Sequence, residues 1–169
     1  MTQEYQAITA KPVITRSQAT WLGERRFDAG PIGRTHRIDA SAKEAPGPVE
    51  TLLNALLTCS ALDVIDILAK RRTPVEKFSA EITGHRRPEF PRRLMRIEIE
   101  VRLDGAGIER EHAERAIQLS FERYCSVAGS LGSDITAEAR LTLNGETGEG
   151  MPLTIWSPER EQAGDTNSQ

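Results

Sequence analysis

Two cysteines are the side chains of this sequence with the greatest capacity for chemistry. Cys59 falls within a long apolar stretch, and Cys125 follows 66 residues later in the segment Tyr-Cys-Ser-Val. Buried free cysteines usually act as small hydrophobic residues, whereas an accessible thiolate is a nucleophile that peroxides oxidise. The pair is therefore open to two interpretations: two core residues, or a redox site.

A thiol in an apolar helix needs a nearby cation to become reactive, because burial raises its pKa. Arg34 and Arg37 lie in the segment before that helix and are available for this purpose. A carboxylate is needed to hold the planar guanidinium in place, and Glu50, in the first turn of the helix, is the candidate. Glu50 could instead only complement the helix dipole.

Other chemistries receive less support from the motifs. The histidines and cysteines are too scattered to form a local ligand pair with zinc-finger or HExxH spacing. Neither a phosphate-binding glycine loop nor a GxSxG serine is present. We therefore expect no metal and no bound cofactor. Asp63 and Asp66 are spaced i,i+3, and we interpret them as the solvent edge of the helix or as partners of Lys70 or Arg71.

The element that carries Cys59 is predicted to be a helix from Val49 to about Lys70. It follows the loop Lys43 to Pro48, and Pro48 stands where a first-turn proline belongs. Apolar residues occur on nearly all sides of this helix, so it must be buried in its own core or in an oligomer interface. Its internal aspartates make a membrane span costly.

The remaining elements follow from the hydrophobic pattern. Short strands are expected around Thr20 to Phe27 and Thr35 to Ala40. Strict alternation over Phe78 to Ile82 and Met95 to Leu103 predicts antiparallel strands with one wet face. A basic loop, Gly84 to Arg93, joins these two strands.

A second helix is predicted from Ile108 or Glu109 to about Tyr124, burying Ala113, Ala116, Ile117 and Phe121, and a last strand spans Ile135 to Leu143. This order of elements predicts an α+β domain with helices on one face of a curved antiparallel sheet. We expect a single domain over residues 1–157 and a flexible tail over residues 158–169.

Length and charge narrow the class of protein. The chain has 169 residues, enough for one well-buried domain. Its net charge of -3 and pI near 5.7 argue against nucleic acid or an anionic membrane as partner. The N-terminal segment has no signal-peptide pattern, so we expect a cytoplasmic protein.

Two motifs together resemble the OsmC/Ohr family of cysteine-based peroxide reductases. The first runs from Gly47 to Cys59 and places Glu50 nine residues before the cysteine; the second is the Arg-Tyr-Cys-Ser-Val segment around Cys125. The resemblance covers about Thr35 to Leu143 and implies the family's fold, an intertwined homodimer in which curved sheets wrap central helices. Val49 and the basic loop depart from the best-characterised peroxidase branches, so the chain resembles the broader OsmC-like branch.

The same resemblance implies a role for each site residue. Cys59 would be the peroxidatic thiolate, Cys125 the resolving thiol, and Glu50 the carboxylate that orients an arginine, either Arg37 or, as second choice, Arg34. The substrate would be an organic hydroperoxide, and a dithiol, of lipoyl type by resemblance to the family, would regenerate the enzyme. An apolar lining from residues such as Leu56, Leu62 and Phe121 is expected to favour organic over hydrogen peroxide. Competing interpretations are a ligand-binding dimer and a redox sensor.

Overall fold

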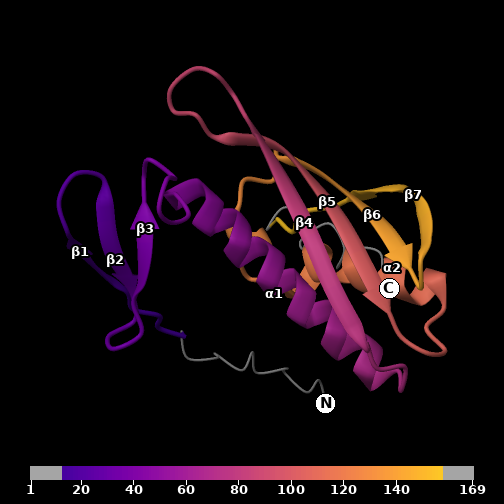
Figure 1. The fold of residues 1–169 in the computed structure, drawn as a ribbon. Helices are drawn as coiled ribbons and strands as arrows, with labels where there is room; N and C mark the ends of the chain where they lie inside the picture. The colour runs from indigo at the N-terminus through magenta and orange to yellow at the C-terminus, as the bar shows by residue number, and fades with distance from the viewer. Residues whose placement is uncertain (1–12, 158–169) are drawn as a thin grey trace, which may run out of the picture. The chain divides into compact units, whose positions relative to one another are not determined.

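The computed structural model describes residues 13–157, which divide into two compact units, one ending at Pro48 and one beginning at Val49 (Figure 1). The first unit holds a three-stranded antiparallel sheet in the order β1 (Gln18–Trp21), β2 (Arg26–Gly30) and β3 (His36–Asp39). The single domain expected over residues 1–157 stays a prediction. The flexible tail expected over residues 158–169 lies outside the described residues.

A turn separates β1 from β2 within the segment from Thr20 to Phe27. Gly23 and Glu24 both have positive φ, at 102° and 52°, and the backbone N–H of Leu22 donates to the carbonyl of Arg26 across this turn. Left-handed backbone ends a strand, so the short strands expected around Thr20 to Phe27 are β1 and β2, separated by the turn at Gly23. The strand expected over Thr35 to Ala40 is confirmed as β3.

A buried carboxylate organises the loop that leads to the long helix. Asp39, 2% exposed at the end of β3, accepts hydrogen bonds from the hydroxyl and backbone N–H of Ser41, at 2.6 and 2.8 Å. It also accepts the N–H groups of Lys43 and Glu44, both at 3.1 Å. These bonds, that of the Ser41 hydroxyl foremost, hold the pKa of Asp39 well below its ordinary value.

This carboxylate predicts acid sensitivity in the first unit. The folded pKa of Asp39 lies below its unfolded value near 3.9, so its stabilisation is complete above that value and is lost as the pH falls through the folded pKa. We expect Asp39→Asn to speed amide hydrogen exchange at Ser41, Lys43 and Glu44 at pH 7. Glu24→Gln, at an exposed carboxylate, is the control, and equal exchange in both variants would contradict the assignment.

The second unit begins with the predicted long helix, α1 (Pro48–Lys70). Its buried residues form one stripe at four-residue spacing: Leu56, Ser60, Val64 and Leu68. Other apolar side chains of α1 stay open, among them Leu62 at 63% exposure. By length and composition alone the helix could cross a membrane. The stripe instead packs α1 on a sheet, and residues 13–157 leave much of the remaining apolar surface of α1 uncovered.

The sheet of the second unit has the order β4 (Lys77–Arg86), β5 (Leu94–Asp104), β6 (Thr136–Leu143) and β7 (Glu146–Leu153). The mixed α+β class is confirmed, but the sheet is not purely antiparallel, because β5 and β6 pair in parallel. A parallel pair needs a crossover connection, and the second helix supplies it. β7, which the sequence pattern did not predict, pairs with β6 at the sheet edge.

The alternation predicted along β5 is confirmed except at its start. Ile97, Ile99, Val101 and Leu103 are all buried, whereas Met95 is 42% exposed and Leu94 is buried in its place. A register shift between His85 and Arg86 on the paired strand explains this difference, since one extra residue reverses the direction of the side chains.

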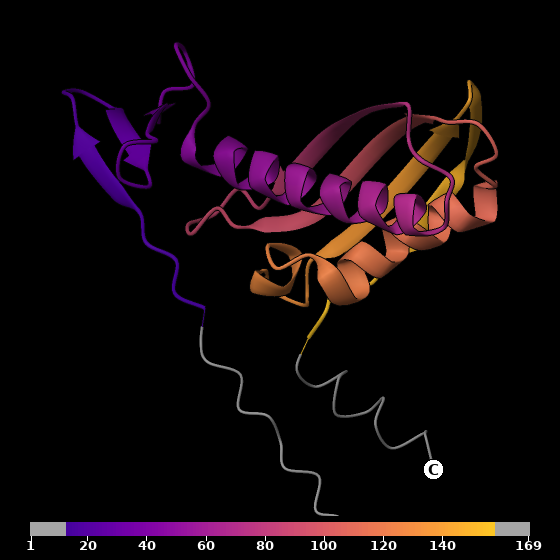
Figure 2. The ribbon, with the colours of Figure 1, turned by 90° about the horizontal axis from the view of Figure 1, so that it is seen from below.

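Two helices lie on one face of this sheet (Figure 2). The second, α2 (Arg110–Leu119), continues directly into a π-type turn, Ser120–Tyr124, so the predicted helix to Tyr124 is confirmed in extent but changes its winding. The expected inward residues of this helix, Ala113, Ala116, Ile117 and Phe121, are all buried. The core therefore lies between the helix pair and the inner face of the sheet.

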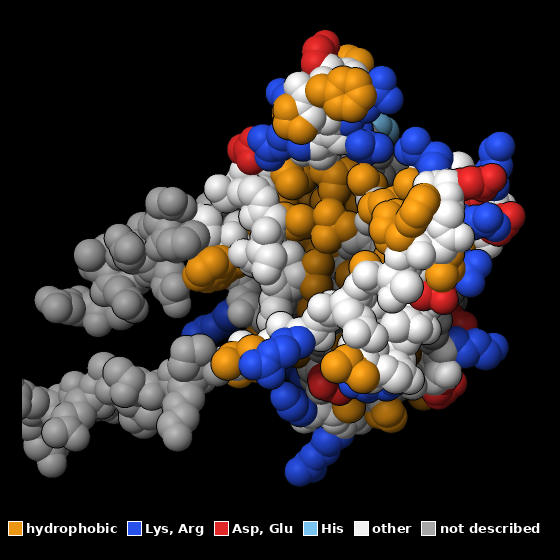
Figure 3. All heavy atoms as spheres, turned by 90° about the vertical axis from the view of Figure 1, so that its left-hand side faces the viewer, with side chains coloured by type: hydrophobic (Ala, Val, Ile, Leu, Met, Phe, Trp, Pro, Cys, Tyr) orange, Lys and Arg blue, Asp and Glu red, His pale blue; other side chains and the backbone are white. Residues whose placement is uncertain are grey.

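The basic loop between β4 and β5 largely satisfies its own charges. Arg86 and Arg87 donate to the carbonyls of Arg92 and Pro91, both at 2.6 Å, and the Arg92 guanidinium lies 4.8 Å from the centre of the exposed Phe90 ring. Arg93 pairs with Asp134. Figure 3 shows this loop at the top, and hydrophobic side chains open at the surface below it.

Candidate functional site

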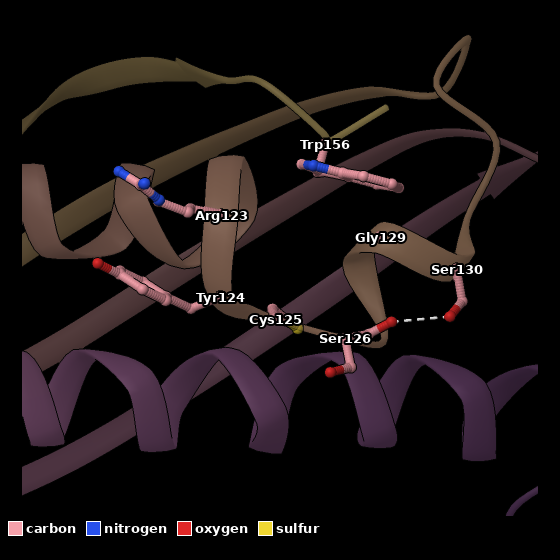
Figure 4. Close-up of a pocket in the computed structure, with 7 residues that line it drawn as sticks. All are labelled: Arg123, Tyr124, Cys125, Ser126, Gly129, Ser130 and Trp156. Atoms are coloured by element: carbon pink, nitrogen blue, oxygen red, sulfur yellow. Dashed lines mark hydrogen bonds between the residues drawn. The ribbon is translucent and has the colours of Figure 1, made fainter. Parts of the chain in front are cut away.

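The fold brings Cys59 and Cys125 together. Cys59 lies in the middle of α1 and Cys125 follows the π-type turn, and both are free thiols. Their sulfur atoms and a carboxylate oxygen of Asp63 all lie within 4.8 Å of one another. In Figure 4 the sulfur of Cys125 points toward α1. The two cysteines singled out from the sequence therefore form one cluster of reactive groups.

The π-type turn explains how Cys125 reaches α1. The backbone N–H of Cys125 donates to the carbonyl of Ser120 at 2.8 Å, a bond between residues five apart. A regular α-helix has 3.6 residues per turn, so side chains five positions apart, such as those of Ser120 and Cys125, would point in different directions from its axis. The wider turn brings them onto one face. Single π-type turns of this kind occur frequently at functional sites.

Ser120 uses this position to hold the carboxylate of Asp63. Its hydroxyl donates to Asp63 Oδ2 at 2.7 Å, and the Ser120 residue is fully buried. Asp63 is one helical turn after Cys59, so the two side chains share a face of α1. Asp63 is half-buried and lines a hollow with Lys70 and Arg71, so the expected position near the solvent edge is correct in part. The expected ion pair with Lys70 or Arg71 does not form within 4 Å among residues 13–157. Asp66 is exposed, as expected.

The environment of Cys125 strongly favours the protonated thiol. The residue is 4% exposed, and burial raises its pKa to about 12, with a further contribution from the adjacent Cys59. The backbone N–H of Ala128 donates to the sulfur at 3.4 Å and opposes this rise. In the resting protein Cys125 is thus a thiol that has to lose its proton before it can react as a nucleophile.

This difference in accessibility predicts selective alkylation of the folded protein. At pH 8 a thiol with a pKa of about 12 is ionised to roughly one part in 10⁴, and Cys125 is buried as well. We expect N-ethylmaleimide to label the part-exposed Cys59 at least about 100-fold faster than Cys125. Peptide mass spectrometry measures both rates, and labelling in guanidinium should be equal. Equal labelling in the folded protein would contradict the burial of Cys125.

The residues expected to activate Cys59 lie at the start of α1 and in the first unit. Glu50 occupies the first turn of α1. Arg37 belongs to β3, where its Nε donates to Asp28 Oδ1 at 2.7 Å, and Asp28 raises the pKa of this guanidinium further. Asp28 and Arg37 face each other in the β2–β3 register. Arg34 lies in the loop before β3, and the activating roles of these residues stay predictions.

A hollow of about 230 Å³ lies beside Cys125, lined by residues from the π-type turn, the following segment and Trp156. Figure 4 shows the Trp156 ring across this hollow from Ser126, whose carbonyl accepts a hydrogen bond from the hydroxyl of Ser130 at 2.7 Å. The sequence reasoning missed Trp156, because its position depends on the β7 strand that precedes it. Of the residues proposed as an apolar lining, Leu56 and Phe121 are buried and Leu62 is exposed.

The cluster of two thiols and a carboxylate is a donor set of the kind that zinc accepts. A closed structural zinc site takes four protein groups, and within residues 13–157 three such groups gather here. The spacing in the sequence gave no sign of this cluster, since its members come from two helical segments. The expectation of no metal stays a prediction.

The fold and the cysteine cluster define the class of protein. It is an α+β protein in which Cys59 of α1 lies close to Cys125, and both helices pack on a four-stranded sheet. The family model described as OsmC-like protein matches residues 40–140. The chain therefore belongs to the OsmC-like family, as the two cysteine motifs predicted.

Individual relatives agree with this assignment. The chain is 40% identical over 88 residues to protein YhfA of Escherichia coli, a match that spans 52% of this chain and 66% of YhfA. Its structure is similar to an OsmC-like protein from Mycoplasma pneumoniae, with a TM-score of 0.70 and 17% identity over 79% of this chain and 99% of that one. It is also similar to an organic hydroperoxide resistance protein OsmC from Legionella pneumophila, with a TM-score of 0.52 and 14% identity over 79% and 98%. The solved structures confirm the predicted α+β fold of the single chain, and the intertwined homodimer stays a prediction.

Proposed function

We propose that this protein is a thiol-dependent peroxidase that reduces organic hydroperoxides in a two-cysteine cycle. The observation that carries the proposal is the approach of Cys59 and Cys125 to within 4.8 Å, although 66 residues separate them in sequence. The name of the Legionella relative, a resistance protein for organic hydroperoxides, points to the same substrate class. Two reduced thiols this close can together supply the two electrons that reduce a peroxide, and they are oxidised to a disulfide.

In this cycle the two cysteines take different roles because their burial differs. Cys59, the more exposed of the two, attacks the O–O bond as a thiolate, releasing an alcohol and becoming a sulfenic acid. Cys125 then condenses with the sulfenic acid to form a disulfide and water. A dithiol reductant, of lipoyl type by family resemblance, reopens the bond through a mixed disulfide. Arg37, oriented by Glu50, is our candidate for the cation that favours the Cys59 thiolate.

The proposed enzyme is a cytoplasmic homodimer that pairs through α1. Much of the apolar surface of this helix is uncovered within one chain: Leu52 is 39% exposed and Leu62 is 63% exposed. Large apolar side chains that gather at a surface mark interfaces, and Figure 3 shows hydrophobic side chains open at the surface on the face that it presents. A partner chain would cover the part of α1 that the sheet does not.

The test of the proposed function is one equivalent of tert-butyl hydroperoxide added to the reduced protein. We expect both free thiols to disappear and the intact mass to fall by two hydrogen atoms per chain. Cys59→Ser should keep the Cys125 thiol, and Cys125→Ser should gain one oxygen atom at Cys59. Unreactive thiols in the wild type would overturn the proposal and favour the ligand-binding dimer. A single oxidation without dithiol-driven turnover would favour a redox sensor.

The proposal includes a preference for organic substrates. Cys125 belongs to the hydrophobic core that contains Leu56 and Phe121, and Cys59 packs against this core. An apolar environment of this kind favours an organic leaving group over water. We expect kcat/KM for cumene hydroperoxide to exceed that for hydrogen peroxide by about tenfold or more, the effect of about 1.4 kcal/mol of apolar contact. Steady-state assays with one dithiol measure the ratio, and equal values would contradict the preference.

A further inference from the structure

Asp63 is a titratable group beside both sulfurs that the cycle described above does not use. Its carboxylate oxygen lies within 4.8 Å of the sulfur atoms of Cys59 and Cys125. Among residues 13–157 it takes part in no ion pair within 4 Å, and its hydrogen-bond donor there is the hydroxyl of Ser120. A carboxylate held in this way beside two thiols has a second capacity, because it can accept and release a proton.

The condensation of the two cysteines requires a proton to move. The Cys125 S–H bond breaks and its sulfur displaces the hydroxyl of the Cys59 sulfenic acid. An S–S bond forms, the S–O bond breaks, and the electron pair of that bond leaves with the oxygen. One proton must leave Cys125, and one proton must reach the departing hydroxide to give water. A single group can meet both needs by carrying the proton from Cys125 to the hydroxide that leaves Cys59.

Bulk water is poorly placed to carry this proton. Cys125 is 4% exposed, and Ser120, its neighbour on the same face of the π-type turn, is fully buried. Burial also raises the pKa of the Cys125 thiol to about 12, so its spontaneous ionisation is rare at neutral pH. A positioned general base accelerates the removal of the Cys125 proton, provided that it reaches this proton directly or through one water.

Resting on the proposed function, we propose that Asp63 takes the proton from the Cys125 thiol and delivers it to the hydroxyl that leaves Cys59. The geometry assigns this role because α1 places Asp63 one turn from Cys59, while the π-type turn places Ser120 beside Cys125. Ser120 is the positioning residue, since its 2.7 Å hydrogen bond fixes the carboxylate. A carboxylate oxygen of Asp63 thus lies within 4.8 Å of both sulfur atoms that take part in the condensation.

The surroundings of Asp63 supply its path to solvent. A hollow of about 380 Å³ is lined by Asp63 and, from the same helix and its end, by Asp66, Lys70 and Arg71, together with Tyr124 of the π-type turn. Lys70, Arg71 and Asp66 surround this hollow with charged groups. Asp66 is exposed and sits one turn further along α1, so it makes a matched control.

The test follows the two chemical steps separately by rapid mixing and intact mass. Reduced Asp63→Asn is mixed with one equivalent of tert-butyl hydroperoxide and quenched over time. We expect Cys59 to gain its oxygen about as fast as in the wild type, because the proposed role of Asp63 begins only after the sulfenic acid has formed. Disulfide formation should slow by about 100-fold, the scale of general acid–base catalysis. The sulfenic acid should therefore accumulate.

Control variants separate proton transfer from folding and from the peroxidase cycle itself. Asp66→Asn should form the disulfide at the wild-type rate, and Asp63→Glu should recover part of it; the unfolding midpoint of each variant shows that it is folded. Disulfide formation in Asp63→Asn within about twofold of the wild type would overturn the role of Asp63. Failure of wild-type Cys59 to oxidise would instead overturn the proposed function.

Discussion

Replacing Cys59 with serine is expected to lower kcat/KM for cumene hydroperoxide by about 1000-fold or more, the scale on which loss of a reacting nucleophile acts. A serine hydroxyl is a far weaker nucleophile than a thiolate, and the buried Cys125 thiol is in no position to replace it. Coupled consumption of a dithiol measures the rate. Thr58→Ala, one residue away on the exposed side of α1, should stay within about twofold.

Replacing Cys125 with serine should lower the rate of turnover by a similar factor, but through a different chemical fate of Cys59. Without the resolving thiol, Cys59 stays a sulfenic acid, and excess peroxide carries it to the sulfinic acid, which a dithiol does not reduce. Intact mass should therefore show two oxygen atoms added to Cys125→Ser and none to Cys59→Ser. Rapid dithiol turnover by Cys59→Ser would contradict the assignment of the attacking cysteine.

Replacing Phe121 with alanine is expected to cost about 3 to 5 kcal/mol of unfolding free energy, as for other buried aromatic residues. Phe121 is 1% exposed and lies against both helices and the sheet, in contact with a small cavity that Val64, Ile99 and Ile117 also line. Its carbonyl accepts the backbone N–H of Trp156 at 3.1 Å. Loss of the Phe121 ring should therefore weaken the packing of the π-type turn that holds Cys125.

Urea unfolding of the reduced protein measures this change. Phe90→Ala is the matched control, because Phe90 is 82% exposed on the hairpin loop and surface substitutions usually stay within about 0.5 kcal/mol. If Phe121→Ala were no more destabilising than Phe90→Ala, the π-type turn would not belong to the core. If folded Phe121→Ala forms the disulfide more slowly than the wild type, the packing of Phe121 contributes to the position of Cys125.

Local patterns in the sequence were enough to predict the elements that bury one face. The helix Pro48–Lys70, the alternation of Ile97, Ile99, Val101 and Leu103, and the inward face of α2 all follow from hydrophobic periodicity. The pairing of Cys59 with Cys125 followed from motif resemblance, not from periodicity. Each helix or strand pattern, and each of the two cysteine motifs, is encoded within a few neighbouring residues.

The features that the sequence did not reveal depend on partners far along the chain. β7 contains two glycines and a proline and gains its strand conformation by pairing with β6. The parallel direction of β6 depends on the crossover, and the register shift at His85 depends on the facing strand. Asp63 looked like a surface residue because its partner, Ser120, lies 57 residues away.

The π-type turn also bears on how relatives of this chain are to be compared. Each residue added to or removed from a helix rotates everything after it by about 100°. The spacing between Ser120 and Cys125, and not only the presence of a second cysteine, therefore decides whether a sulfur faces α1. A relative with both cysteines and one residue fewer in this turn would keep the motif and lose the pair. Chain length through the turn is thus a criterion for function that residue identity alone does not supply.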